Sequence, residues 1–384
     1  MQNHSDEHQT HVVFQAFSSL PDPRTGNRKW HNLFDMVVIA ILAFICGADH
    51  WTEVEMFGKQ REEWLRTFLE LPEGIPSHDT FGRVFALLSP EAFERAFESW
   101  VQDIQELTHG SVVAIDGKTV RRSHDRLNAH KPIHLVSAWS TANGMVLGQR
   151  KVDEKSNEIT AIPELLESLL LKGCIVTIDA MGCQKEIVNQ VREQKADYVI
   201  ALKGNQPTLH EDVQLFFQDV KQPIFQDTEH AYYKTVEKGH GRIEIRRHWL
   251  SPAPEALRPG HDWRDLLGVG MVESERHIEG TISIERRYYI SSFHTNVETF
   301  AHAVRSHWSI ENGQHWVLDI AFREDEQRIR INNAAENAAL LRRLALNLLK
   351  QEKTKKVGIA SKRKLCGWDN AYLLTVLSHG SKKV

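Results

Sequence analysis

Two short apolar runs, each ending in an aspartate, decide the fold of this chain: Val112-Val113-Ala114-Ile115-Asp116 and Cys174-Ile175-Val176-Thr177-Ile178-Asp179. Both are rich in β-branched residues, which is typical of buried strands. Between them, Asn143-Gly144 is flanked by two further strand-like runs, so the sequence predicts a hairpin there. The predicted elements in chain order are a strand (112–116), a hairpin (134–139 and 145–152), a helix (157–171), a strand (174–179), a helix (184–194) and a strand (198–203).

This order predicts an α/β fold. The hairpin is antiparallel, whereas strands joined through helices are parallel neighbours, so the sheet is expected to be mixed. Strand, hairpin, helix, strand, helix, strand is the order of a ribonuclease H-like core. Strand-like alternation returns at 205–293 and is followed by a helical pattern at 297–320, so 205–293 is interpreted as a β-rich insertion before the last helix of the core.

Helical periodicity dominates from about residue 30 to residue 108, where Ser89 and Pro90 mark one helix start. Helices around the turn at 75–81 predict a small helical domain that binds DNA ends, with a plain helical bundle as the alternative. The predicted domains are the helical amino-terminal domain (1–110), the catalytic core (111–204 and 294–349), the insertion (205–293) and a basic carboxy-terminal tail (350–384).

Charge, cysteine spacing and the length of apolar runs indicate which classes of protein this chain can belong to. The net charge is −4, but from Leu340 onward eleven Lys or Arg residues face only Glu352 and Asp369, so the tail is expected to attract phosphate or to form a solvated helix face. The four cysteines form no C-x-x-C pair, so the sequence indicates neither a zinc knuckle nor a disulfide framework. The longest apolar run (36–46) is shorter than a membrane span needs. We therefore expect a cytoplasmic, nucleoid-associated protein that does not enter a membrane.

The two strand-terminal aspartates predict a metal-dependent site. Asp116 and Asp179 lie side by side if their strands are neighbours, at the sheet edge where α/β proteins bind ligands. Carboxylates converging without cysteine favour Mg²⁺, for which Mn²⁺ can substitute, and two such ions catalyse in-line displacement at phosphorus. A third acid is expected from the helix after the insertion.

That helix carries polar residues four apart, and hence on one face: His307, Glu311, His315 and Asp319. Glu311 is the predicted third acid, because neutral imidazole is a poor ligand for a hard ion. Zinc binding and an exposed polar stripe are the alternatives for this face. The zinc alternative lacks the H-E-x-x-H order.

Five motifs occur in one order along the chain: Asp116-Gly117-Lys118, Thr177-Ile178-Asp179-Ala180-Met181, Leu202-Lys203-Gly204-Asn205-Gln206, His240-Gly241-Arg242 and His307-Trp308-Ser309-Ile310-Glu311-Asn312. Together they resemble the bacterial insertion-sequence DDE transposases, and within these the H-repeat-associated subgroup linked to Rhs elements. The resemblance covers nearly the whole chain. It implies a ribonuclease H-like core, with Asp116, Asp179 and Glu311 as catalytic ligands of two Mg²⁺ ions.

The resemblance also implies DNA as the partner, namely terminal inverted repeats and target DNA, with a homodimer in the DNA complex. Much of the family shows a Tyr, Arg, Glu, Lys pattern around the glutamate, where this chain has Val304, His307, Glu311 and Leu318. Other side chains are therefore expected to replace the DNA-contacting Arg and Lys. The expected DNA-binding residues are Lys118, Lys203, Arg242, Arg305 and His307.

The predicted function is strand cleavage at element ends followed by strand transfer into target DNA, since both steps are in-line attacks at phosphorus. A ribonuclease H-like endonuclease that cuts without joining is one alternative. An inactive DNA-binding relic of a transposase is the other, because the fold alone does not establish chemistry.

Overall fold

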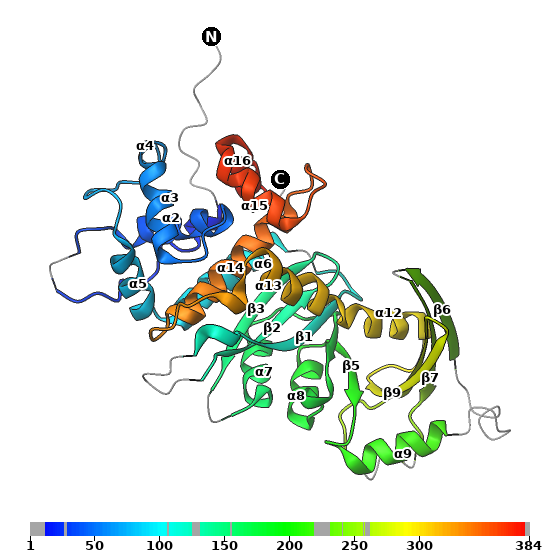
Figure 1. Ribbon diagram of the computed structural model, residues 1–384. Coiled ribbons are helices and arrows are strands. Elements are labelled where there is room, and N and C mark those ends of the chain that lie inside the picture. Colours follow the sequence, from blue (N-terminus) through cyan, green and yellow to red (C-terminus); the bar gives the residue numbers. More distant parts are fainter. Residues whose placement is uncertain are drawn as a thin grey trace.

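The computed structural model describes residues 12–26, 29–105, 107–124, 131–153, 156–218, 231–239, 241–255, 257 and 262–380. The amino-terminal part is helical, as predicted (Figure 1). Two predicted helix features are confirmed: Ser89 accepts a hydrogen bond from the Ala92 amide, and Pro90 is the first residue of its helix. The helices are α1 (Val12–Gln15), α2 (Leu33–Ile45), α3 (Trp51–Gln60), α4 (Glu62–Leu65), α5 (His78–Leu87) and α6 (Pro90–Ile104).

The core sheet has the predicted mixed topology. Strand β1 pairs antiparallel with β2 and parallel with β4, and β4 pairs parallel with β5. The hairpin of β2 and β3 turns at Gly144, whose φ of 62° suits glycine. The elements of this half are β1 (Val112–Thr119), η1 (Arg121–Ser123), β2 (His134–Ser140), β3 (Met145–Val152), α7 (Glu158–Glu167), β4 (Ile175–Ile178), η2 (Ala180–Gly182), α8 (Lys185–Glu193) and β5 (Asp197–Leu202).

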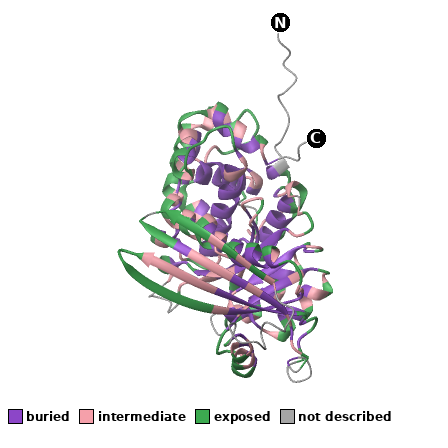
Figure 2. Ribbon diagram, turned by 90° about the vertical axis from the view of Figure 1, so that its right-hand side faces the viewer, coloured by how far each residue is buried: buried purple, intermediate pink, exposed green. Residues whose placement is uncertain are grey.

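The β-rich insertion extends the same sheet. Strand β9 pairs antiparallel with β5, and the sheet order in the described residues is β3-β2-β1-β4-β5-β9-β8-β7-β6. These long strands are buried at the end near the core and more exposed at the other end (Figure 2). The elements are α9 (Pro207–Phe217), β6 (Ala231–Gly239), β7 (Arg242–Pro252), β8 (Gly268–Ile278) and β9 (Thr281–Ser291).

Helices cover both faces of the core sheet. Figure 1 shows α7 and α8 beneath the sheet and the helices that follow β9 above it. These are α12 (Val297–His307), η3 (Glu311–His315), α13 (Trp316–Ala321), η4 (Glu324–Glu326), α14 (Ala334–Gln351), α15 (Ile359–Trp368) and α16 (Asn370–Ser378). The predicted α/β class, with a mixed sheet, a β-rich insertion and preceding helices, is confirmed.

The amino-terminal helices share their core with the rest of the chain. Helix α2 is buried along almost its whole length and packs on α14, as α5 and α6 also do. One hydrophobic cluster contains residues of α2, α6, β3 and α14. Removing the amino-terminal helices would therefore expose the buried face of α14. The boundary of the amino-terminal domain near residue 110 stays a prediction.

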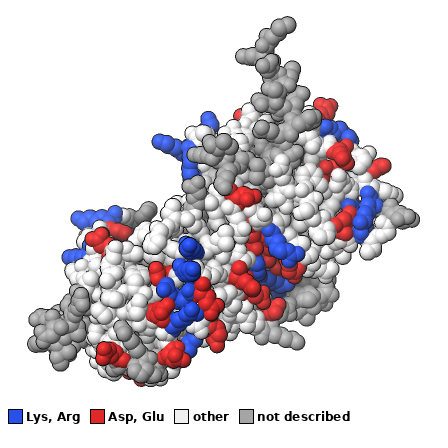
Figure 3. All heavy atoms as spheres, turned by 180° about the vertical axis from the view of Figure 1, so that it is seen from behind, with Lys and Arg blue, Asp and Glu red and all other residues white. Residues whose placement is uncertain are grey.

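The carboxy-terminal segment folds into α15 and α16, and several of its cations are buried. Arg342 and Arg343 are fully buried, Lys362 pairs with Glu352 at 2.9 Å, and Arg363 pairs with Asp49 at 3.2 Å. Lys382 and Lys383 lie outside the described residues. On the side opposite to Figure 1, basic and acidic residues are interspersed (Figure 3). Within the described part of the chain, no helix is long and apolar enough to cross a membrane.

Candidate active site

Asp116 and Asp179 lie next to each other because their strands are paired in parallel. The register places Ile115 of β1 opposite Ile178 of β4. The next residue on each strand is an aspartate, Asp116 after Ile115 and Asp179 after Ile178. Strand β4 ends at Ile178, whereas β1 continues to Thr119 along β2. Asp179 leaves the sheet and caps η2, where its Oδ1 accepts hydrogen bonds from the amides of Met181 (2.9 Å) and Gly182 (3.4 Å).

Glu311 approaches the pair from the helices above the sheet. Helix α12 crosses β1 and β4, and Glu311 begins the π-helical turn η3 that follows it. Gly313 in this turn packs on Trp139, since a Cβ there would lie 2.8 Å from the indole ring. π-Helical turns are rare and often occur at functional sites. Asp116, Asp179 and Glu311 line one cavity of about 420 Å³ with Lys203, His307 and Trp308.

Burial and mutual repulsion disfavour the ionised aspartates. The pKa of Asp116 is raised to about 7. Burial is the main cause, the negative charges of Glu158, Asp179 and Glu311 add to it, and a hydrogen bond from the Gly117 amide opposes it. Burial also raises the pKa of Asp179, with Glu158 as the next cause. A cation between these carboxylates would relieve the repulsion that raises both pKa values.

The donor set fits a hard cation in its chemistry, because it consists of carboxylate oxygens. In the part of the chain that the structure describes, however, no three His, Cys, Asp or Glu side chains are grouped closely enough to hold a metal ion. This finding applies both to Asp116, Asp179 and Glu311 and to the zinc alternative at His307 and His315, so metal binding by either set is a proposal. Burial lowers the pKa of these imidazoles to about 4 and about 3, so both are neutral.

The other members of the predicted helix face contact the sheet below. His307 shares a hydrogen bond with the Thr177 hydroxyl at 3.1 Å. His315 lies with Nδ1 3.7 Å from Oδ2 of Asp116. Asp319 pairs with Lys118 at 2.7 Å. These contacts hold α12, η3 and α13 against β1 and β4, so the polar stripe is not simply solvated.

Of the predicted DNA-binding residues, two contact other residues of the protein, and three line one of two neighbouring cavities. Lys118 is 8% exposed and is surrounded by Asp319, Asp325 and Glu324, and His307 bonds to Thr177. Lys203 is exposed at the cavity and lowers the pKa of Asp179 electrostatically. Arg242 and Arg305 lie instead in a neighbouring pocket. The structure therefore brings Lys203 to the carboxylates and leaves Lys118 and His307 engaged within the protein.

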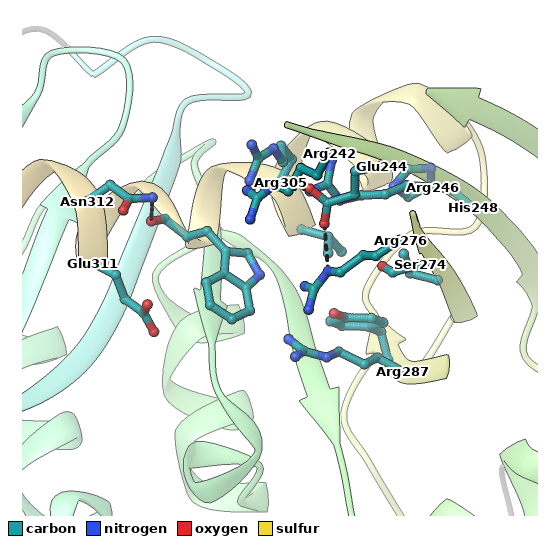
Figure 4. A pocket seen from close by; sticks show the side chains of 14 residues that line it. Arg242, Glu244, Arg246, His248, Ser274, Arg276, Arg287, Arg305, Glu311 and Asn312 are labelled. Carbon is teal, nitrogen blue, oxygen red and sulfur yellow. Dashed lines mark hydrogen bonds and ion pairs between the residues drawn. The ribbon is translucent and has the colours of Figure 1, made fainter. Parts of the chain in front are cut away.

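That neighbouring pocket, the arginine pocket, lies between β7, β8, β9 and α12 (Figure 4). Its volume is about 300 Å³. Glu244 at its wall pairs with Arg246 at 2.6 Å and with Arg276 at 3.0 Å. Arg287 lies 5.0 Å from the ring centre of Trp308. The arginines that line the pocket are Arg242, Arg246, Arg276, Arg287 and Arg305.

The arginine pocket opens next to the carboxylates. Trp308 and Glu311 line both it and the active-site cavity. Sequence patterns indicated Arg242 and Arg305 but missed Arg246, Arg276 and Arg287. Alternation in 242–247 and 285–291 was a usable signal for Arg246 and Arg287, because it marks two strands, β7 and β9, that flank β8 in one sheet.

Sequence reasoning also missed Glu158 and His134, which pair at 2.6 Å beside Gly117. Glu158 follows the helix cap Asn157, whose side chain accepts a hydrogen bond from the Ile159 amide. A glutamate at a helix start is common for electrostatic reasons alone, so no specific signal in the sequence indicates this pair.

Two family models and several relatives match the chain. A model described as DDE_Tnp_1-associated matches residues 14–101, and the Transposase DDE domain matches residues 108–348. "Putative transposase YncI" of Escherichia coli O157:H7 is 43% identical over 377 residues, which cover 96% of this chain and 95% of the relative. "H repeat-associated putative transposase YhhI" of Escherichia coli K12 is 40% identical over 371 residues, which cover 95% and 97%. The predicted resemblance is confirmed: the chain belongs to the bacterial DDE transposase family.

Proposed function

We propose that this transposase cleaves DNA at the ends of its element and transfers the freed 3′ ends into target DNA, with Asp116, Asp179 and Glu311 as its catalytic residues. The observation that carries the proposal is the convergence of these carboxylates in one cavity, where Asp179 directly follows β4 and Asp116 lies within β1, which continues to Thr119. Each comes from a different element, and ligands of α/β sheets bind beyond the carboxyl ends of strands such as β4.

The three carboxylates would hold two Mg²⁺ ions, or Mn²⁺ in their place. When bound, such ions activate the attacking oxygen and stabilise the leaving one during displacement at phosphorus. The raised pKa values of Asp116 and Asp179 support this assignment, because crowded and buried carboxylates gain from a bound cation. The protein's own part is to fix the carboxylates in position.

DNA is the proposed substrate, and the arginine pocket beside Glu311 is its proposed backbone contact. Arg242 and Arg305 have side chains about half exposed, and the exposed Lys203 lines the active-site cavity. Phosphate contacts of this kind position a strand without reading its sequence. Lys118 and His307 are proposed to position β1 and α12 rather than to contact DNA. A homodimer in the DNA complex remains part of the proposal.

The decisive experiment incubates the purified full-length chain with Mg²⁺, DNA carrying its element's ends, and a target plasmid. End cleavage and joined products are expected for the native chain, and neither for Glu311→Gln. The matched control is Glu298→Gln, an exposed glutamate in the first turn of α12. Cleavage without joined products would favour the endonuclease alternative. Specific binding without cleavage would favour an inactive relic.

The DNA contacts are tested separately by salt dependence. The double variant Arg242→Ala with Arg305→Ala is expected to reduce the slope of log affinity against log salt by about 2. The control is Arg264→Ala, an exposed arginine that pairs with Glu193. An unchanged slope in the double variant would move the DNA away from the arginine pocket.

A further inference from the structure

The indole of Trp139 lies beside the turn that carries Glu311. Trp139 belongs to β2 and is paired with Ala114 of β1, and Ser137, two residues earlier, is paired with Asp116. Residues opposite each other in an antiparallel pair point to the same face of the sheet, and so do residues two apart along one strand. Trp139 therefore lies on the same face as Asp116, one strand away.

The pairing of β2 with β3 is irregular at this residue. Ala138 is paired with Gly148 and Trp139 with Val146, so Leu147 is an extra residue on β3. Such a β-bulge increases the local twist and can re-aim a side chain, and bulges are frequent next to active sites. The Trp139 side chain is 2% exposed, so its ring is buried between the hairpin and the elements that cover it.

The ring contacts the chain on both sides of Glu311, the first residue of the π-helical turn η3. Two residues before Glu311, the Ser309 hydroxyl accepts a hydrogen bond from the indole Nε1 of Trp139 at 3.2 Å. Two residues after it, Gly313 lies so close to the ring that a Cβ would be 2.8 Å from Cζ2. A larger residue at position 313 would therefore have to displace either the ring or the turn.

Lys350 contacts the same ring from the last turn of α14. Its Nζ lies 4.8 Å from the ring centre, and the face of an indole attracts a cation. Helix α14 packs on β3 (Figure 1). Its Asn347 side chain accepts a hydrogen bond from the Val146 amide and donates one to the Val146 carbonyl, both at 2.8 Å. The hairpin, the π-helical turn and the end of α14 thus meet at Trp139.

We propose that Trp139 is a positioning residue, which holds the π-helical turn and thereby fixes Glu311 relative to Asp116. The inference rests on the proposed function, because it assumes that Glu311 acts in DNA cleavage. A tryptophan that only fills the core would, when changed, lower the stability of the fold without a specific effect on the cleavage of bound DNA. The cleavage rate at saturating DNA therefore separates the two roles.

The first test measures end cleavage at saturating DNA in Mg²⁺, together with DNA affinity and thermal unfolding. Trp139→Phe and Ser309→Ala remove the same hydrogen bond, so each is expected to slow cleavage about tenfold without changing DNA affinity. The double variant should be no slower than the slower single variant, because only one interaction is lost. Ser309→Ala leaves the indole in place and serves as the folded variant if Trp139→Phe does not fold.

Trp100→Phe is the matched control. Trp100 is also fully buried, and its indole donates a hydrogen bond to the Gly380 carbonyl at 3.0 Å. The same change at this position should lower the thermal stability and leave the cleavage rate at saturating DNA at the native value. An equal loss of cleavage rate in Trp100→Phe and Trp139→Phe would overturn the positioning role.

Gly313→Ala tests the second contact without changing the indole. The added methyl group must move the ring or the turn, and a shift of about 1 Å in a reacting group can cost about a hundredfold in rate. We therefore expect cleavage about a hundredfold slower. The control is Gly58→Ala in α3, where a Cβ would lie 2.7 Å from the Ile75 side chain. This variant should cleave bound DNA at the native rate.

Hydrogen exchange measures the hold on the turn directly and does not depend on cleavage. In the DNA-free protein, amides of residues 309–316 should exchange several-fold faster in Trp139→Phe than in the native chain, because a turn that has lost a contact opens more often. Trp100→Phe should leave their exchange unchanged. Native exchange of this segment in both Trp139→Phe and Ser309→Ala would overturn the positioning role.

Glu311→Gln separates failure of the inference from failure of the proposed function. If Glu311→Gln is inactive while the three variants at the indole contacts cleave bound DNA at the native rate, the positioning role is overturned and the proposed function stands. If Glu311→Gln cleaves like the native chain, or if the native chain does not cleave, the proposed function falls together with the inference.

Discussion

Asp116→Asn should make the cation-free protein more stable at alkaline pH, although it removes the proposed catalysis. The ordinary pKa of an aspartate is 3.8, and that of Asp116 is raised to about 7, mainly by burial. Between these values the folded chain binds the proton more tightly than the unfolded chain. The free energy of unfolding therefore falls as the pH rises from about 4 to about 7, and the destabilisation is complete above that range.

The size of the effect follows from the same shift. Moving from 3.8 to about 7, at about 1.36 kcal/mol per pKa unit, gives about 4 kcal/mol at pH 8. This is the upper limit of the gain, because the asparagine amide must still be accommodated beside His315. At about pH 5, Asp116 is protonated in the folded chain, and binding this proton against the ordinary pKa of 3.8 costs only about 1.5 kcal/mol by the same arithmetic. The advantage of Asp116→Asn should therefore shrink by more than half on acidification.

The assay is urea unfolding in EDTA at about pH 5 and about pH 8 for the native chain, Asp116→Asn and the control Glu298→Gln. Mg²⁺ added at the higher pH should raise the unfolding midpoint of the native chain and narrow the gap to Asp116→Asn, since a ligand of the folded state stabilises it. The reasoning is refuted if Asp116→Asn is less stable than the native chain at pH 8, or if its advantage is the same at both pH values.

Three further outcomes are expected. Asp179→Asn should abolish end cleavage in Mg²⁺ while gel-shift affinity for DNA stays within a few-fold of native, and native-rate cleavage would remove Asp179 from the centre. Glu311→Gln should cut in neither Mg²⁺ nor Mn²⁺, whereas Asp319→Asn should keep measurable activity because Asp319 pairs with Lys118 at 2.7 Å; the reverse pattern would misplace the third acid. Glu324→Gln should lower the free energy of unfolding by about 3–5 kcal/mol in urea titrations, because it leaves the fully buried Arg343 without its partner at 2.7 Å; a loss under about 1 kcal/mol would show that water reaches Arg343.

The sequence predicted the parts of the site that depend on strand register. Asp116 and Asp179 each end an apolar run, and parallel pairing of such runs brings their last residues together. Glu311 was predictable because it stands in a motif that follows the insertion. Its final position depends on the π-helical turn at Glu311–His315, which no simple spacing rule indicates.

Contacts between distant segments could not be predicted in the same way. Lys118 was expected just beyond the end of a strand, where it would be available to phosphate. The structure places it within β1, where three acids from α13 and η4 surround it. Glu158 looked like an ordinary helix start, and only the missing side chain of Gly117 brings it close to β1. In both cases tertiary packing decides the role of a charge that local sequence leaves undetermined.

One continuous stretch of chain links the insertion to α12, the helix that precedes Glu311. Strand β9 pairs with β5 of the core and carries Arg287, and α12 begins only six residues after β9 ends. Arg287 then contacts Trp308, three residues before Glu311. The position of Glu311 relative to the arginine pocket is therefore set by strand pairing and does not depend on the movement of a separate domain. A DNA strand held by the arginines would meet Glu311 in a position set by the pairing of β5 with β9, so substitutions that loosen this pairing should impair cleavage more than they impair DNA binding.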